Sequence, residues 1–321
     1  MRVAGRVVTP EGVLDAAAVK VEADRIAAVV PDDTVHSGHW IVPGFVDMHV
    51  HGGGGYTFTT GEPEQARGAA AFHLAHGTTT LLASLVSSPV ERMVAATKAY
   101  QPLVDEGVLA GVHYEGPYLS QLRCGAQNPR YLRDPSRDEL DTLVAAGATV
   151  GTHVFNGMRP PHHRQPGPVF ALLAAPSVVC EFVADGHHLH DGTLAFATTV
   201  TGPDRAALVT DAMSAAGMGD GRHDLGDQTV VVRDGIARLA GGDTLAGSTL
   251  TMDAALRQAV RAGVPLVDAC RMAATTPAAA LGLGTDVGAL RAGLRADLVE
   301  LTEDLQVVRV MRAGSWVAKG A

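Results

Sequence analysis

Two histidines separated by a single residue could together hold a metal ion in this sequence. His49 and His51 end the apolar stretch FVDMHVH, residues 45–51, and four glycines follow directly. In a β-strand, alternate side chains point to the same side, so both imidazoles would face one site with Val50 opposite. The glycines would let backbone pass close to a ligand there. Such pairs also occur without function on surfaces and in cores, so this pair alone does not predict a metal site.

Three more chemically active side chains stand at the ends of apolar stretches. Glu115 ends VLAGVHYE, His153 closes TVGTHVFN and Asp211 lies near the end of ALVTDAM. Taken singly, they could be a solvated carboxylate, a hydrogen-bonded histidine in a barrel mouth and the N-cap of a following helix. Together they extend one pattern, because four of six candidate strands end in His, Glu or Asp, and barrel active sites gather at the C-terminal ends of strands. The joint pattern predicts a metal site.

Such a site indicates a hydrolytic reaction. A divalent ion held by imidazole and carboxylate, with one position open, lowers the pKa of bound water and supplies hydroxide near neutral pH. A carboxylate beside the ion can take the proton of that water and pass it to a leaving group. Asp211 is our candidate for this acid/base role. We therefore expect hydrolysis of an amide, an ester or a related bond.

Other polar clusters concern the substrate. Asn156, Gly157 and Arg164 follow one of these strands, and His188 follows the next. A guanidinium with imidazole and backbone amides suits a phosphate group, although a surface arginine and a solvated histidine loop are alternatives. The small-residue loop TLAGSTLTM, residues 244–252, either closes over a ligand or simply enters a helix.

The elements that would position these residues read as an α/β barrel with a small β domain. Short apolar runs alternate with helix-like segments between residues 43 and 284, as in βα units around a parallel sheet. The six expected strands are residues 45–51, 78–85, 108–115, 149–156, 178–185 and 207–213. The expected helices are residues 62–77, 89–107, 136–147, 251–263 and 265–282, several of them closed by glycine. Residues 1–42 and 285–321 read as β segments of one small domain.

Composition excludes several classes of protein. The 321 residues carry a net charge of -9 without a basic run or aromatic-basic patch, which argues against nucleic acid as a partner. No apolar run has the roughly 18 residues of a membrane span, and the first ten residues lack the apolar core of a signal peptide, so we expect a cytoplasmic protein without membrane contact. The three cysteines are far apart and form no CxxC pair, so we expect reduced thiols.

Six motifs, in order along the chain, closely resemble the N-acetylglucosamine-6-phosphate deacetylases of the amidohydrolase superfamily. They are PGFVDMHVHGGGG, HYEGPYLS, GTHVFNGMRPPHHRQPG, ADGHHLH, LVTDAMSAAGM and TLAGSTLTMDAA. The resemblance runs over nearly the whole chain. It implies a (β/α)8 TIM barrel with a β-sandwich built from both termini, and usually a homodimer. It also implies removal of acetate from N-acetylglucosamine 6-phosphate to give glucosamine 6-phosphate.

The resemblance also implies roles for individual residues. Glu115 and His153 match metal ligands, His49 and His51 match the pair that holds a second ion in two-metal members, and Asp211 matches the catalytic acid/base. One or two divalent ions, zinc above all, are the implied cofactor. The positions that match substrate contacts are Ala126, Gln127, Asn156, Gly157, Arg164, His188, Leu245, Ala246 and Gly247. In such dimers the partner chain can supply part of the phosphate clamp.

Two features depart from the family pattern. The family usually reads KGAH where this chain reads CGAQ, with Cys124 and Gln127, and glutamine can donate a hydrogen bond but cannot carry charge. Family members also carry two further βα units between the strands of Glu115 and His153, the second of which ends in a metal-binding histidine. We expect these two units to be missing here. His113 shares a strand face with Glu115 and is a poor replacement, because it would sit deeper in the barrel.

Two other functions stay open on the sequence. A shortened chain could be a catalytically impaired or non-catalytic sugar-phosphate binder, and an amidohydrolase could act on another N-acyl substrate. Arg164 and His188 speak against the second alternative because they suit a phosphate.

Overall fold

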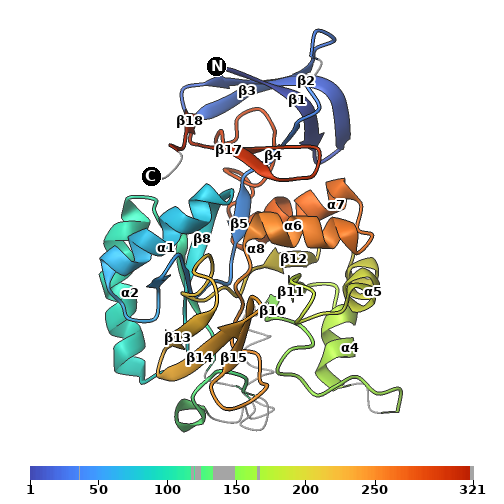
Figure 1. The fold of residues 1–321 in the computed structure, drawn as a ribbon. Helices are drawn as coiled ribbons and strands as arrows, with labels where there is room; N and C mark the ends of the chain where they lie inside the picture. The colour runs from blue at the N-terminus through green and yellow to red at the C-terminus, as the bar shows by residue number, and fades with distance from the viewer. Residues whose placement is uncertain (36, 117–118, 120–123, 133–148, 165–166, 319–321) are drawn as a thin grey trace.

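The computed structural model describes residues 1–35, 37–116, 119, 124–132, 149–164 and 167–318. The helix expected over residues 136–147 lies outside the described residues. Figure 1 shows a β layer at one end of the molecule, which carries both termini, and a larger α/β body below it.

The β layer is one seven-stranded sheet made by both ends of the chain. Its strands are β1 (Arg2–Thr9), β2 (Gly12–Glu22), β3 (Arg25–Pro31), β4 (Trp40–Pro43), β16 (Leu298–Leu301), β17 (Val307–Arg312) and β18 (Ser315–Trp316), in the order β18-β17-β16-β4-β1-β2-β3. Val7, Ile41 and Leu298 belong to its own buried cluster. The sheet curls, because Arg25 at the start of β3 bridges Arg295 just before β16.

In the described residues, the α/β body contains six parallel strands in two sheets of three. The first sheet has the order β5 (Phe45–Asp47), β8 (Thr78–Leu85), β9 (Gly111–Tyr114), and the second has β10 (Val150–Gly151), β11 (Val179–Val183), β12 (Ala206–Val209). Each lies inside or within one residue of a range expected from the sequence. Backbone bonds beyond the ends of β5 and β12 join the two sheets, since Asp211 N donates to His49 O at 2.9 Å.

One detail of the sequence analysis is wrong. Strand β5 ends at Asp47, so His49 and His51 lie beyond it rather than on it. The cause is a change of partner, because His51 N bonds to Ala212 O and Val50 N to Ser84 Oγ instead of continuing a ladder. These bonds, to residues near the ends of the neighbouring strands β8 and β12, still hold the two imidazoles next to each other.

Helices cover the outside of the strands (Figure 1). They are α1 (Pro63–Ala75), α2 (Val90–Asp105), α4 (Gly167–Ala174), α5 (Asp191–Thr201), α6 (Met252–Arg261), α7 (Leu266–Cys270) and α8 (Thr276–Ala280). A π turn, η3 (Arg271–Thr275), links α7 to α8, and a short 3₁₀ turn, η2 (Pro129–Tyr131), precedes the next gap in the described chain. The sequence analysis missed α4 and α5. No helix of the described part of the chain has the length and apolar character that crossing a bilayer requires.

Two small antiparallel elements were not expected from the sequence. They are the pair β6 (Gly52–Gly53) with β7 (Tyr56–Thr57), and the meander β13 (Gly221–Leu225), β14 (Gln228–Arg233), β15 (Ile236–Leu239). One face of the meander buries Leu225, Val230 and Val232 against Met213, just past β12. The meander therefore covers the C-terminal side of the strands.

The β layer and the barrel share one core. Phe45 begins β5 and is fully buried in the same cluster as Val42 and Val299 of the β layer. Gly77 follows α1 with φ of +91°, and its carbonyl accepts a bond from Phe45 N at 2.9 Å. A Cβ at Gly77 would lie 2.7 Å from Phe45 Cε2.

This packing predicts that Gly77→Ala destabilises the fold by roughly 2–4 kcal/mol, the sum of a left-handed backbone penalty and overpacking against Phe45. The matched control is Gly107→Ala after α2. Gly107 also has a positive φ, of +73°, but a Cβ there meets no atom of the described residues within 4 Å. The control should lose only about 1 kcal/mol. Urea unfolding of both variants checks the prediction, and equal losses would contradict it.

Candidate metal centre and active site

Three buried side chains converge beyond the ends of β5 and β9. His49 Nε2 and His51 Nε2 lie 3.2 Å apart, and His51 Nε2 lies 3.0 Å from Glu115 Oε2. His49 Nε2 is 3.7 Å from the same carboxylate oxygen. One donor atom from each of these residues lies within 4.8 Å of the other two. The geometry thus brings together three of the residues that the sequence singled out.

The outer nitrogens of the imidazoles are tied to hydrogen-bond acceptors. His51 Nδ1 faces Ser84 O at 3.1 Å, and His153 Nδ1 faces Asn156 O at 3.1 Å. A carbonyl oxygen can only accept, so both Nδ1 atoms carry the proton. His49 Nδ1 faces Glu181 Oε2 at 3.0 Å and donates in the same way. Partners of this kind fix the tautomer of metal-binding histidines and turn the Nε2 lone pairs inward.

These donors fit a divalent metal ion. With the Nδ1 protons tied outward, the Nε2 atoms of His49 and His51 face each other across 3.2 Å in a buried site. Two bare lone pairs at this distance would repel each other, so a proton or a metal ion must lie between or beside the nitrogens. Two imidazole nitrogens and a carboxylate oxygen are ligands that zinc and similar ions bind.

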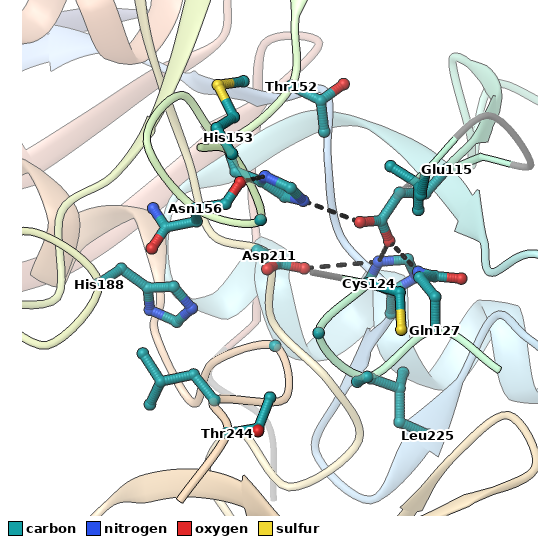
Figure 2. A pocket seen from close by; sticks show the side chains of 18 residues that line it. Glu115, Cys124, Gln127, Thr152, His153, Asn156, His188, Asp211, Leu225 and Thr244 are labelled. Carbon is teal, nitrogen blue, oxygen red and sulfur yellow. Dashed lines mark hydrogen bonds and ion pairs between the residues drawn. The ribbon is translucent and has the colours of Figure 1, made fainter. Parts of the chain in front are cut away.

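His153 approaches the other side of the Glu115 carboxylate. Its Nε2 lies 2.9 Å from Glu115 Oε1, and its ring stacks on His49 at a centroid distance of 5.6 Å. It is therefore adjacent to the three-residue group of His49, His51 and Glu115 but is not a member of it. Figure 2 shows the bond from His153 reaching Glu115.

Asp211 lies against the same two imidazoles. Its Oδ1 is 3.4 Å from His51 Nε2 and 3.6 Å from His49 Nε2. The residue adopts a φ of +48°, and His153 and Phe155 also have positive φ. Non-glycine residues in this region are strained, and such strain gathers at functional sites. The turn after β12 thus aims the Asp211 carboxylate at the metal ligands.

Charge within the cluster shifts the pKa values of its members. Burial alone would lower the pKa of His49, but the carboxylates of Glu181 and Asp211 hold that pKa well above its ordinary value. Burial alone would raise the pKa of Glu115, yet hydrogen bonds from His153 and His49 keep that pKa well below its ordinary value. Without a metal ion, these shifts favour a protonated His49 imidazole and a negatively charged Glu115 carboxylate.

The sequence analysis missed Glu181. It sits in the middle of β11, fully buried, and accepts bonds from His49 Nδ1 and from His153 N at 3.2 Å. A lone carboxylate inside the apolar stretch VVCEFVAD was the available signal. His113 remains apart from the ligand group of the described residues, with Nδ1 on Ser84 Oγ, and burial next to His49 lowers its pKa to about 4.

A cavity of about 570 Å³ opens above this cluster (Figure 2). Of the residues proposed from the sequence, those that line it are His51, Glu115, Ala126, Gln127, His153, Asn156, Gly157, His188, Asp211, Leu245 and Gly247. His49 is buried beneath it, and Ala246 is packed in the core under the meander. Arg164 is exposed and is not among the lining residues. The structure therefore does not bring Arg164 to the cavity of its own chain.

Comparisons with known proteins decide the family. The amidohydrolase family profile matches residues 136–317, which is more than half of the chain. The chain belongs to the amidohydrolase family. It is 31% identical to an N-acetylgalactosamine-6-phosphate deacetylase of Escherichia coli O157:H7 over 97% of both chains. It is 30% identical to an N-acetylglucosamine-6-phosphate deacetylase of Lysinibacillus sphaericus, over 91% of this chain and 89% of the relative.

A solved structure agrees over the full length. N-acetyl-D-glucosamine-6-phosphate deacetylase of Mycobacterium smegmatis is 37% identical, with a TM-score of 0.91, over 99% of this chain and 100% of that one. This amidohydrolase therefore has a TIM-barrel body with a small β domain, as expected. It is a metal-dependent hydrolase, and the group of His49, His51 and Glu115 supplies a site for a divalent ion.

Glu181 gives a test of the metal centre. We expect Glu181→Gln to weaken metal binding about 10- to 100-fold, because the charged acceptor of His49 Nδ1–H is lost. The matched control is Glu300→Gln in the β layer, whose carboxylate bonds to His39 and Arg309. Competition with a chromogenic chelator measures both affinities. Equal affinity of the two variants would show that Glu181 has no part in holding the ion.

Protons should compete with the ion for the same nitrogens. Because the pKa of His49 is raised, its imidazole is protonated at neutral pH without metal, and binding must release that proton. We expect the apparent metal affinity to rise between pH 6 and pH 8. Calorimetry in two buffers of different ionisation enthalpy would detect the released protons. Identical heats in both buffers would contradict this assignment.

Proposed function

We propose that this amidohydrolase removes the acetyl group from N-acetyl-D-glucosamine 6-phosphate, giving acetate and D-glucosamine 6-phosphate. The observation that carries the proposal is the His49, His51 and Glu115 group at the base of a cavity, beside Asp211. Solved deacetylases for this substrate support it at a TM-score of 0.91 and 37% identity. One relative is named for N-acetylgalactosamine 6-phosphate, which differs from the proposed substrate in the configuration at C4. Which of these two sugar phosphates the enzyme prefers is therefore the question that an assay must answer.

Asp211 is the proposed acid/base. A divalent ion bound by the cluster would polarise the acetyl carbonyl and acidify a nearby water. Asp211 takes a proton from that water while the water oxygen attacks the carbonyl carbon. The same carboxylate then gives the proton to the amide nitrogen as the C–N bond breaks. Asp211 lines the cavity, where a bound substrate can reach it.

Polar groups around the cavity are proposed to orient the sugar. Asn156 Nδ2 is buried and has no hydrogen-bond partner among the described residues, so a substrate oxygen could satisfy it. His188 is fixed by Asp185, whose Oδ2 lies 2.7 Å from its Nδ1, and so presents Nε2 to the cavity. The loop of residues 244–252 is bonded to the backbone of Asp211, since Ser248 N donates to Asp211 O at 2.7 Å. We assign it both ligand contact and entry into α6, for which Thr251 is the N-cap residue.

Recognition of the substrate's phosphate group would require a second copy of the chain. The described residues that line the cavity include no lysine or arginine, whereas a phosphate needs a cation. Arg164 is exposed, away from its own cavity. We propose that Arg164 of one copy contacts the phosphate held by the other copy.

We also propose that the barrel lacks two βα units between Glu115 and His153. The alignment with the Escherichia coli relative has 368 positions and this chain has 321 residues, so at least 47 positions lack a residue here. That is about the length of two units in a barrel of roughly 250 residues. In the described residues, β9 and β10 share no ladder. The proposed domains are residues 43–284 for the barrel and residues 1–42 with 285–321 for the small β domain, in which the described strands form one curled sheet rather than the expected β-sandwich.

Zinc is the proposed ion, because imidazole and carboxylate donors suit it, and the number of ions is one or two. The proposed location is the cytoplasm, where its three cysteines, none of them paired, would stay reduced.

Turnover tests the function directly. We expect the zinc-loaded protein to release acetate from N-acetylglucosamine 6-phosphate, and Asp211→Asn to lower kcat about 10²- to 10⁴-fold with metal content unchanged. Parallel assays with the galactose epimer and with unphosphorylated N-acetylglucosamine define the substrate. Binding of glucosamine 6-phosphate without metal or turnover would instead identify a non-catalytic binder. Equal turnover with and without the phosphate would identify another N-acyl substrate.

A further inference from the structure

The side-chain amide of Gln127 is held in one orientation. Gln127 is buried, and its Oε1 accepts a bond from Ser87 N at 2.8 Å. A backbone N–H can only donate, so this contact fixes which end of the amide is oxygen. The Nε2 group must then face Glu115, whose Oε2 accepts its bond at 2.5 Å.

Ser87 holds the backbone of Glu115 as well. Its Oγ donates to Glu115 O at 2.9 Å, while Glu115 N donates to Leu85 O at 3.0 Å. This approach needs glycine at the next position, because a Cβ on Gly116 would lie 2.0 Å from Ser87 Oγ. Ser87, just beyond the end of β8, thus anchors both the main chain of Glu115 and the Gln127 amide that contacts the Glu115 side chain.

The oxygen that Gln127 holds is the one in the metal group. Glu115 Oε2 lies 3.0 Å from His51 Nε2, whereas Oε1 is bonded to His153. Rotation of the carboxylate would break the bonds to Gln127 and His153 together. Charge-assisted N–H bonds of this kind orient ligating carboxylates.

We propose that Gln127 is a positioning residue, which holds Glu115 Oε2 toward the metal ion. This inference rests on the proposed metal-dependent function. It gives Gln127 a role that differs from a contact with the substrate carbonyl, although the side chain also borders the cavity. Figure 2 shows Gln127 beneath Glu115, with Cys124 beside it.

Metal affinity separates the two roles. We expect Gln127→Leu, which keeps the size but removes the amide, to raise the zinc Kd about 10- to 100-fold in chelator competition. Its cobalt-loaded form should show altered visible absorption, because the carboxylate ligand is free to turn. Gln127→His restores one N–H donor and should recover most of the affinity. The control Asn128→Ala removes a neighbouring amide whose oxygen accepts a bond from Arg130 N, which lies outside the metal cluster, and it should bind zinc like the wild type.

Each outcome has one meaning. A thermal unfolding scan first establishes whether Gln127→Leu is folded. If it is not, the test compares the zinc affinity of Gln127→His with that of Gln127→Asn, because asparagine is too short to reach Glu115. Unchanged zinc affinity and cobalt spectrum in a variant with reduced kcat/KM would overturn the proposal and place Gln127 on the substrate. Failure of the wild type itself to bind zinc would overturn the metal-dependent function, and this inference with it.

Discussion

The structure depends on two imidazole nitrogens that face each other in a buried site. His49 Nε2 and His51 Nε2 lie 3.2 Å apart in almost completely buried side chains, an arrangement that needs positive charge, from a proton or a metal ion, to be stable. The surrounding residues are placed to supply or respond to that charge. Glu115 and Asp211 bring carboxylates to the Nε2 side, and Glu181 accepts the hydrogen bond of His49 on the Nδ1 side. A metal ion satisfies all of them at once.

This cluster stands where the two parallel sheets meet. On one side the sheets are joined by backbone, through bonds between the residues that follow β5 and β12. On the other side, among the described residues, the contact between the residues that follow β9 and β10 is the side-chain bond from His153 to Glu115. The active-site residues therefore also bridge the place where two βα units are proposed to be missing. An ion bound there would strengthen the barrel as well as serve the reaction.

Much of this arrangement could be predicted from sequence because it is local. Alternating and continuous apolar stretches located the six parallel strands of the described residues, and the strand ends singled out Glu115, His153 and Asp211. What failed depended on contacts between distant segments. Glu181 looked like part of a buried strand until His49 was seen to meet it from 132 residues away. The meander β13–β15 was missed although residues 230–232 are three consecutive valines, because its apolar face is buried against residues beyond β12.

The sequence by itself determined the fold class, the family motifs and the kinds of atoms at the site, since these follow from periodicity and residue type. Only the tertiary structure decided which atoms meet. It placed His49 and His51 beyond the end of β5, put Arg164 outside its own cavity and turned the Gln127 amide toward Glu115. The physical reason is that hydrogen-bond direction and burial arise from packing between segments far apart in the chain, and spacing along the chain carries no record of either.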